Sequence, residues 1–148
     1  MIIQNKIGKF KVNLSNDSLN KSSTVFEKEL QTWVPKSRHK TFVDIGANIG
    51  FYSIYALNKR KFSKVHCFEV NPEVLKLLES NIKLNNLQSK ILVNKIALGS
   101  NNKSLYFEKK KIHTGASQIS SKTEGKNIIK VEQTTFDNYV TENKIDIK

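Results

Sequence analysis

The sequence has few of the residues that mark disulfide scaffolds, flexible repeats and membrane spans. Its 148 residues include one cysteine, two prolines and six glycines. The single thiol, Cys67, excludes an intrachain disulfide framework and a cysteine-based zinc site, and is typical of a reducing compartment. The longest apolar run, residues 54–57, is far shorter than the ~20 residues that span a bilayer. Because the first residues after Met1 also lack the apolar centre of a signal peptide, the sequence predicts a cytoplasmic protein without a membrane span.

Arginine is scarce too, although the chain is strongly basic. The formal net charge is +12, but only Arg38 and Arg60 among the 25 basic residues are arginines. Lysine carries a hydrated point charge, whereas arginine offers the planar fork that is common at phosphate and guanine contacts. The scattered lysines therefore favour a solvated surface, and nucleic acid is not the expected partner. Charge alone leaves RNA as an alternative partner.

The remaining composition, with 38% hydrophobic residues, is that of one globular domain, which we divide into two parts. Residues 1–40 are predicted to form a hairpin and a helix that packs on the domain as a cap. A capping box of Thr24 and Glu27 would begin this helix, and Pro35 would end it. Residues 41–148 are predicted to form the core of the domain.

The core alternates short apolar runs with helical patterns, as parallel sheets with crossover helices do. Strands are expected at 42–45, 64–69 and 90–97, with helices between them. The second helix is well marked, since Asn71 can cap it and Pro72 suits its first turn. The sequence thus predicts an α/β, Rossmann-like sheet with right-handed crossovers.

The pattern changes after Gly99. Residues 104–107 and 128–134 predict an added antiparallel hairpin around a long polar loop. A final short helix is expected to begin near Thr135 or Asp137.

The residues with the clearest functional pattern lie where the first core strand turns into its helix. Gly46 and Gly50 allow a tight turn and a close approach of backbone to ligand, and Asn48 tolerates positive φ. Ligands of such sheets bind at the carboxyl ends of the strands. Neither the Gly-x-Gly-x-x-Gly dinucleotide pattern nor the phosphate loop Gly-x-x-x-x-Gly-Lys-Ser/Thr is present. A carboxylate at Asp44, two residues before the first glycine, suits a cationic ligand better than a pyrophosphate.

A second carboxylate, Glu69, ends the next strand 23 residues after Gly46. At this position an acidic side chain can accept hydrogen bonds from the hydroxyls of a ribose. One carboxylate near a sulfonium group, one at a ribose and apolar walls for adenine describe a site for S-adenosylmethionine.

Three separated segments resemble the FkbM family of S-adenosylmethionine-dependent methyltransferases. They are Phe-Val-Asp-Ile-Gly-Ala-Asn-Ile-Gly-Phe-Tyr-Ser from residue 42, Phe-Glu-Val-Asn-Pro-Glu from residue 68 and Asn-Lys-Ile-Ala-Leu-Gly from residue 94, followed by a later Thr-Phe-Asp. The resemblance covers residues 41 to about 140 and implies methyl transfer to an oxygen, most often a hydroxyl of a saccharide or small metabolite.

By this resemblance, the first turn would line the methionine part of the cofactor, Glu69 the ribose, and Asn71 with Ala97 the adenine. The cofactor-binding residues it implies are Asp44, Gly46, Ala47, Asn48, Gly50, Tyr52, Ser53, Glu69, Val70, Asn71 and Ala97. His113, in a polar loop, is the candidate general base. The three histidines and the single cysteine suggest no metal site.

The family pattern continues with a strand close to Ile-Lys-Ile-Asp-x-Glu-Gly, which this sequence lacks. We therefore expect a sheet without its last strands and a methyltransferase core that is incomplete at its C-terminus. The unpaired edge of the first strand would then favour self-association. One alternative, suggested by charge alone, is an RNA methyltransferase. The other is a truncated, non-catalytic domain that binds nucleosides or protein partners.

Overall fold

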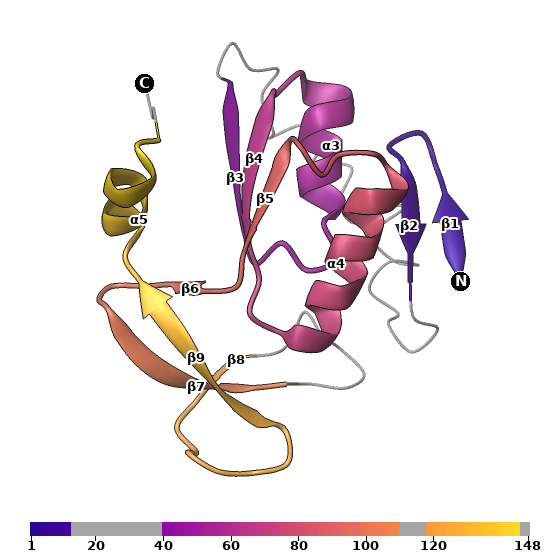
Figure 1. The fold of residues 1–148 in the computed structure, drawn as a ribbon. Coiled ribbons are helices and arrows are strands. Elements are labelled where there is room, and N and C mark those ends of the chain that lie inside the picture. The colour runs from indigo at the N-terminus through magenta and orange to yellow at the C-terminus, as the bar shows by residue number, and fades with distance from the viewer. Residues whose placement is uncertain (13–39, 110–117, 146–148) are drawn as a thin grey trace.

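The computed structural model describes residues 1–12, 40–109 and 118–145. Its strands form a two-stranded sheet β1-β2, a three-stranded sheet β3-β4-β5 and a four-stranded sheet β6-β9-β7-β8 (Figure 1). The strands are β1 (Ile2–Gln4), β2 (Lys9–Lys11), β3 (Thr41–Ile45), β4 (Lys64–Phe68), β5 (Ile91–Asn94), β6 (Ala97–Leu98), β7 (Lys103–Glu108), β8 (Gln118–Ser120) and β9 (Ile128–Thr134). The helices are α3 (Phe51–Arg60), α4 (Pro72–Leu84) and α5 (Phe136–Asn143).

The three-stranded sheet is parallel and forms the centre of the fold. Helices α3 and α4 lie on one side of it and α5 on the other (Figure 1). Successive side chains of a strand point to opposite faces, so Val65 and Cys67 join the core cluster beneath α3 and α4. His66 and Phe68 instead contact Tyr139 of α5. This arrangement is the Rossmann-like α/β sheet that the sequence predicts.

The helix α4 begins as its sequence predicts. The Asn71 side chain accepts a hydrogen bond from the Glu73 amide at 3.1 Å, and Pro72 occupies the first turn. Its apolar stripe, which includes Leu78 and Ile82, is buried against the sheet. The last helix, α5, is capped by Thr135 rather than by Asp137.

The N-terminal hairpin packs beside α4 (Figure 1). Phe10, on its middle strand position, is almost fully buried and its ring lies 5.6 Å from that of Phe51. The predicted hairpin is therefore present. The predicted helix after Thr24 lies outside the described residues.

The third core strand is not continuous, and the prediction of one strand over 90–97 is wrong. β5 ends at Asn94, opposite Phe68, and the chain then leaves the parallel sheet. Ala97 and Leu98 form β6, which pairs in parallel with β9 in the other sheet. The predicted antiparallel pair is confirmed as β7 and β9, and β8 adds to it within the segment expected to be a loop.

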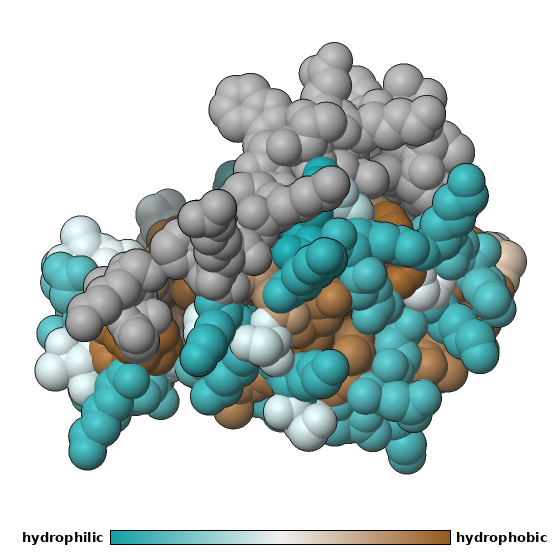
Figure 2. Space-filling model, turned by 90° about the horizontal axis from the view of Figure 1, so that it is seen from above, coloured by the Kyte–Doolittle hydropathy of each residue, from teal (hydrophilic) through white to brown (hydrophobic). Residues whose placement is uncertain are grey.

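The four-stranded sheet lies across the carboxyl ends of the parallel strands (Figure 1). The opposite end of the molecule, viewed in Figure 2, shows hydrophilic side chains spread over the face with apolar surface between them. None of the described helices is long and apolar enough to cross a membrane. Among the described strands, β3 pairs with β4 alone, which leaves its other edge without a partner strand in this part of the chain.

Candidate functional site

The turn between β3 and α3 is held in a left-handed backbone conformation at three positions. Gly46, Asn48 and Gly50 have φ values of 77°, 50° and 87°. Two successive amides of the turn, those of Gly46 and Ala47, donate to the carbonyl of Phe68 at 2.9 Å. A Cβ at Gly46 would meet nothing within 4 Å, so open space lies in front of the turn.

Glu69 joins this turn to the next one. Its Oε2 accepts from the amide of Asn48 at 2.9 Å, and its Oε1 accepts from the amides of Val70 and Asn71 at 2.9 and 2.8 Å. A carboxylate has about four acceptor positions, so these bonds leave one, on Oε2. The side chain is thus fixed by the backbone and keeps one acceptor position for a ligand.

Asp44 lies behind the turn rather than in front of it. Its carboxylate is buried and accepts a 2.6 Å hydrogen bond from the Ser53 hydroxyl, which is itself fully buried. Burial raises the pKa of Asp44, and the hydrogen bonds from Ser53 only partly oppose this rise. The pair ties the end of β3 to the first turn of α3, which sets the shape of the glycine turn.

A cavity of about 230 Å³ lies at the carboxyl ends of β3 and β4. Its lining residues are Ile45, Gly46, Asn48, Phe68, Glu69, Val70, Ile96, Ala97, Leu98 and Phe107. Glu69 is the only ionisable side chain among them, and most of the others are apolar. The cavity thus combines one carboxylate with apolar walls. The carboxylate can attract a cationic sulfonium or accept from a ribose hydroxyl, and the apolar walls fit a flat base.

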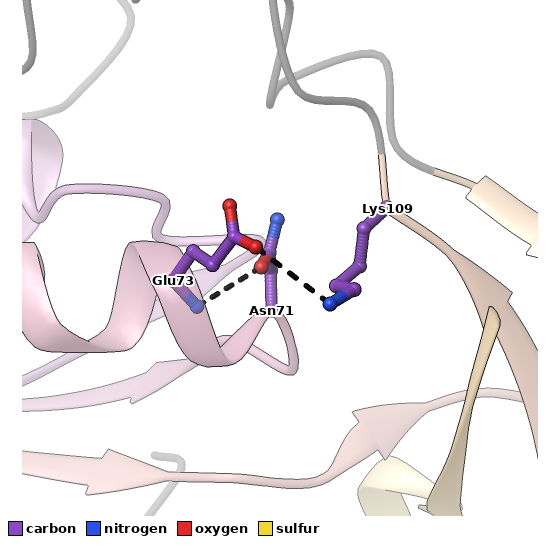
Figure 3. A network of polar contacts seen from close by, with 3 residues as sticks. All are labelled: Asn71, Glu73 and Lys109. Carbon is purple, nitrogen blue, oxygen red and sulfur yellow. Dashed lines mark hydrogen bonds and ion pairs between the residues drawn. The ribbon is translucent and has the colours of Figure 1, made fainter. Parts of the chain in front are cut away.

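The second turn, after β4, contains Asn71, whose burial is nearly complete at 2% exposure. Figure 3 shows Asn71 and Glu73 at the start of α4, with Lys109 of the chain following β7 reaching toward them. The Lys109 ammonium lies 3.7 Å from a Glu73 carboxylate oxygen. The four-stranded sheet is therefore linked to α4 by an ion pair beside the cavity.

The structure places the predicted site residues in two groups. Those that line the cavity are Gly46, Asn48, Glu69, Val70 and Ala97. Those that shape its turns from behind or beside it are Asp44, Ala47, Gly50, Tyr52, Ser53 and Asn71. His113 lies outside the described residues and stays a prediction. Among the described residues, no group of three or more His, Cys, Asp or Glu side chains could hold a metal ion.

Five further lining residues were not predicted. Ile45, Phe68, Ile96 and Leu98 are direct neighbours in sequence of predicted ones, so their strand-end positions could have identified them. Phe107 had no such signal, because β7 reaches the cavity only through the reversal of the chain after β6.

The sequence profile of the TRM5/TYW2 methyltransferase domain matches residues 7–114, which include both turns and the cavity. The chain belongs to this family. This assignment confirms the prediction of a methyltransferase domain with S-adenosylmethionine as its cofactor. Membership of the FkbM family in particular is not shown.

Solved structures similar to this TRM5/TYW2 chain include an FkbM methyltransferase and a Trm5. A methyltransferase FkbM from Methylobacillus flagellatus KT is 20% identical with a TM-score of 0.45, over 79% of this chain and 26% of that one. Trm5 from Methanocaldococcus jannaschii, in complex with adenosine, is 24% identical with a TM-score of 0.37, over 58% of this chain and 24% of that one. The chain thus spans about a quarter of each. No curated protein matches the chain.

Proposed function

We propose that the cavity at the carboxyl ends of β3 and β4 binds the nucleoside part of S-adenosylmethionine. The observation that carries this proposal is the Glu69 carboxylate, which three backbone amides hold at the cavity with one acceptor position to spare. That position suits one ribose hydroxyl, whereas the sequence alone suggested bonds to both. At about 230 Å³, the cavity is smaller than the ~300–1,000 Å³ typical of sites that enclose whole ligands, so it suits a part of the cofactor.

The residues of the chain act on the reaction chiefly by binding and orienting. When bound, the cofactor supplies a methyl group activated by its sulfonium charge. The turn at Gly46 and Asn48 allows close approach of the backbone, and the Glu69 carboxylate favours a nearby cation. Apolar side chains such as Phe68 and Leu98 exclude water from the cavity. Holding two reactants in line accounts for a large part of the barrier lowering in transfers of this kind.

For the methyl acceptor we propose RNA, in place of the saccharide or small-metabolite hydroxyl predicted from the motifs. The family match favours RNA, and the net charge of +12 supplies the sequence-independent attraction to phosphates. Lysine can bind phosphate as a point charge, so the many lysines fit contacts to the RNA backbone, whereas the scarcity of arginine leaves few side chains for bidentate contacts to guanine.

The cofactor site is tested by calorimetry with S-adenosylhomocysteine. Glu69→Gln is expected to weaken binding at least tenfold, because an amide nitrogen replaces one of two oxygens that accept backbone bonds. Glu79→Gln is the matched control, since Glu79 is an exposed carboxylate of α4 paired with Lys95. Equal affinity of the wild type and the Glu69 variant would contradict the proposed site.

Asp44→Asn separates a role of charge from a role of shape. The amide keeps an acceptor for Ser53 but carries no charge, so retained affinity would show that Asp44 supports the turn without attracting the cofactor. The Asp44→Ala variant is expected to bind poorly in either case.

The acceptor is tested by transfer of a radiolabelled methyl group to total RNA or to a mixture of saccharides. Labelled RNA, with a yield that falls steeply as salt rises, supports the RNA proposal. Labelled saccharide alone would contradict it. Cofactor binding with no transfer to either would instead identify a domain that binds nucleosides without catalysis.

Three expectations from the sequence stay proposals. They are a cytoplasmic location, the division at residue 40 into a capping part and a core, and self-association through the edge of β3 that no described strand pairs. Ile45 at the end of that strand is 63% exposed, which favours the last of them. A mass from light scattering that stays monomeric over a wide concentration range would count against it.

A further inference from the structure

The wall of the cavity opposite the glycine turn comes from a different sheet. Ala97 and Leu98 belong to β6, and Phe107 belongs to β7, both in the four-stranded sheet. All three side chains are apolar. These side chains therefore offer contact to a flat ring and no side-chain hydrogen bond to a ligand.

One face of β7 lies toward the parallel sheet. Leu105, Phe107 and Lys109 alternate along the strand and its continuation, so they share a face. Leu105 is buried, Phe107 lines the cavity, and the Lys109 side chain is 18% exposed. Tyr106 lies on the other face of the strand and does not line the cavity.

Lys109 connects this face of β7 to α4. Its ammonium lies 3.7 Å from the carboxylate of Glu73 (Figure 3), which stands in the first turn of α4. Glu73 follows Asn71, whose amide is bonded to Glu69. The ion pair therefore links the aromatic wall to the same turn that holds the carboxylate of the site.

We propose that Phe107 contacts the adenine ring of the cofactor and that Lys109, through Glu73, positions it. The added sheet then contributes to the affinity for the nucleoside and is not only a covering of the strand ends. This inference rests on the proposed function, because it assigns a further residue to the same site. Base–aromatic contacts of this kind are sequence-tolerant and depend on the area of the ring.

The test is calorimetry with adenosine and with S-adenosylhomocysteine on Phe107→Ala and Phe107→Leu. Phe107→Ala is expected to weaken both ligands about tenfold and by the same factor, because the contact is to the base that they share. Phe107→Leu should lie between the wild type and the alanine variant, and it serves alone if the alanine variant does not fold. Tyr106→Ala is the matched control, from the opposite face of the same strand, and should leave both affinities unchanged.

The positioning role is tested on Lys109. Lys109→Met is expected to weaken adenosine about two- to fivefold, given the modest strength of partly exposed ion pairs, and Lys109→Arg should restore the affinity. Loss of affinity in both variants to the same extent would overturn the ion-pair role.

Failure of the inference and failure of the proposed function are distinguishable. If the wild type binds adenosine, Glu69→Gln loses it and Phe107→Ala keeps it within twofold, the assignment of Phe107 is wrong and the site stands. If Phe107→Ala weakens S-adenosylhomocysteine but not adenosine, the contact to adenine is also wrong. If the wild type binds neither ligand, both proposals fall.

Discussion

Asn81 of α4 and Lys11 of β2 bond to each other as residues of neighbouring strands do. The Lys11 amide donates to Asn81 Oδ1 at 2.5 Å, and Asn81 Nδ2 donates to the Lys11 carbonyl at 3.3 Å. Asn85 repeats the pattern with Lys9, at 2.9 and 2.7 Å. Residues four apart on a helix are separated by about 6 Å along its axis, close to the ~6.6 Å between alternate residues of a strand. The helix thus pairs with the free edge of the hairpin through side-chain amides.

Replacing the buried Asn81 should destabilise the protein more than replacing Asn85, whose bonds to Lys9 are exposed. Asn81 is fully buried and also donates to the Ile49 carbonyl at 2.9 Å, so Asn81→Ala leaves buried backbone groups without partners. We expect a loss of about 2–4 kcal/mol in the free energy of unfolding. Asn85→Ala, whose bonds to Lys9 are exposed, should cost about 1 kcal/mol. Urea denaturation measures both, and equal losses would contradict the pairing.

Replacing two glycines of the first turn with alanine should have different effects, chiefly on stability at Gly50 and on ligand affinity at Gly46. At Gly50 the new Cβ would lie 2.6 Å from a methyl group of Leu78, a fully buried side chain, and φ is 87°. Backbone strain and overpacking together predict a loss of about 2–4 kcal/mol.

At Gly46 the space is open and only the strain remains, about 1–2 kcal/mol. Gly46→Ala should instead weaken S-adenosylhomocysteine, because its methyl group enters the region in front of the turn. Denaturation and calorimetry on both variants separate the two effects. A Gly46 variant with full affinity would show that this space is not used by the ligand.

His66 should make the protein less stable in mild acid. The Tyr139 hydroxyl donates its proton to Asn94 Oδ1 at 2.9 Å. The hydroxyl oxygen of Tyr139 therefore accepts from His66 Nδ1, which lies 2.7 Å away and carries a proton. Burial, together with Lys64, lowers the pKa of His66 below its usual 6.5. The unfolded chain then binds a proton more readily than the folded one, so this stability is complete above about pH 6.5 and is lost as the pH falls.

The measurement is the free energy of unfolding of the wild type and of His66→Gln between about pH 5 and 8. The difference between them should be flat above neutrality and should decline below about pH 6.5. Contributions of other groups, including the opposite slope from the raised pKa of Asp44 at lower pH, cancel in this difference. A flat difference throughout would show that protonation of His66 is not linked to folding.

Cys67 should react with thiol reagents only when the chain unfolds. Burial, and to a lesser degree the nearby Asp44 carboxylate, raises the pKa of Cys67 to about 12. The thiolate is the reactive form, so the folded protein should be inert at about pH 8. Because the sequence has one cysteine, the rate of labelling with a disulfide reagent across a urea series reports opening of the sheet directly. Immediate labelling in native buffer would contradict the buried position.

Much of the parallel unit follows from local sequence signals. The cap at Asn71, the glycine turn and the acidic end of β4 each depend on residues within a few positions of one another, so their pattern is visible in the chain. The start of α5 is also visible in the sequence, where Thr135 is one of two candidate capping residues beside Asp137. The predicted antiparallel pair follows from two apolar runs of strand length.

What the sequence did not predict depends on contacts between distant segments. Where β5 ends, the side chain of Asn94 donates to the Cys67 carbonyl and accepts from Tyr139, 45 residues later. The polar residues Asn94 and Lys95 interrupt the apolar run at this point, but they do not by themselves show that the chain passes to another sheet. The same holds for Phe107, whose place at the cavity depends on how one sheet crosses the ends of another, and for Asp44, whose hydrogen bond to Ser53 joins the end of β3 to α3.

A ligand held between Glu69 and Phe107 would bridge the three-stranded and the four-stranded sheet at this end of the molecule. Binding to the folded form alone raises the free energy of unfolding by an amount that grows with ligand concentration. Here the added stability would act at the boundary between the two sheets. If a protease cuts one sheet first in the free protein, the ligand should protect both sheets together. Cooperativity between the two halves would then be a property that the ligand confers.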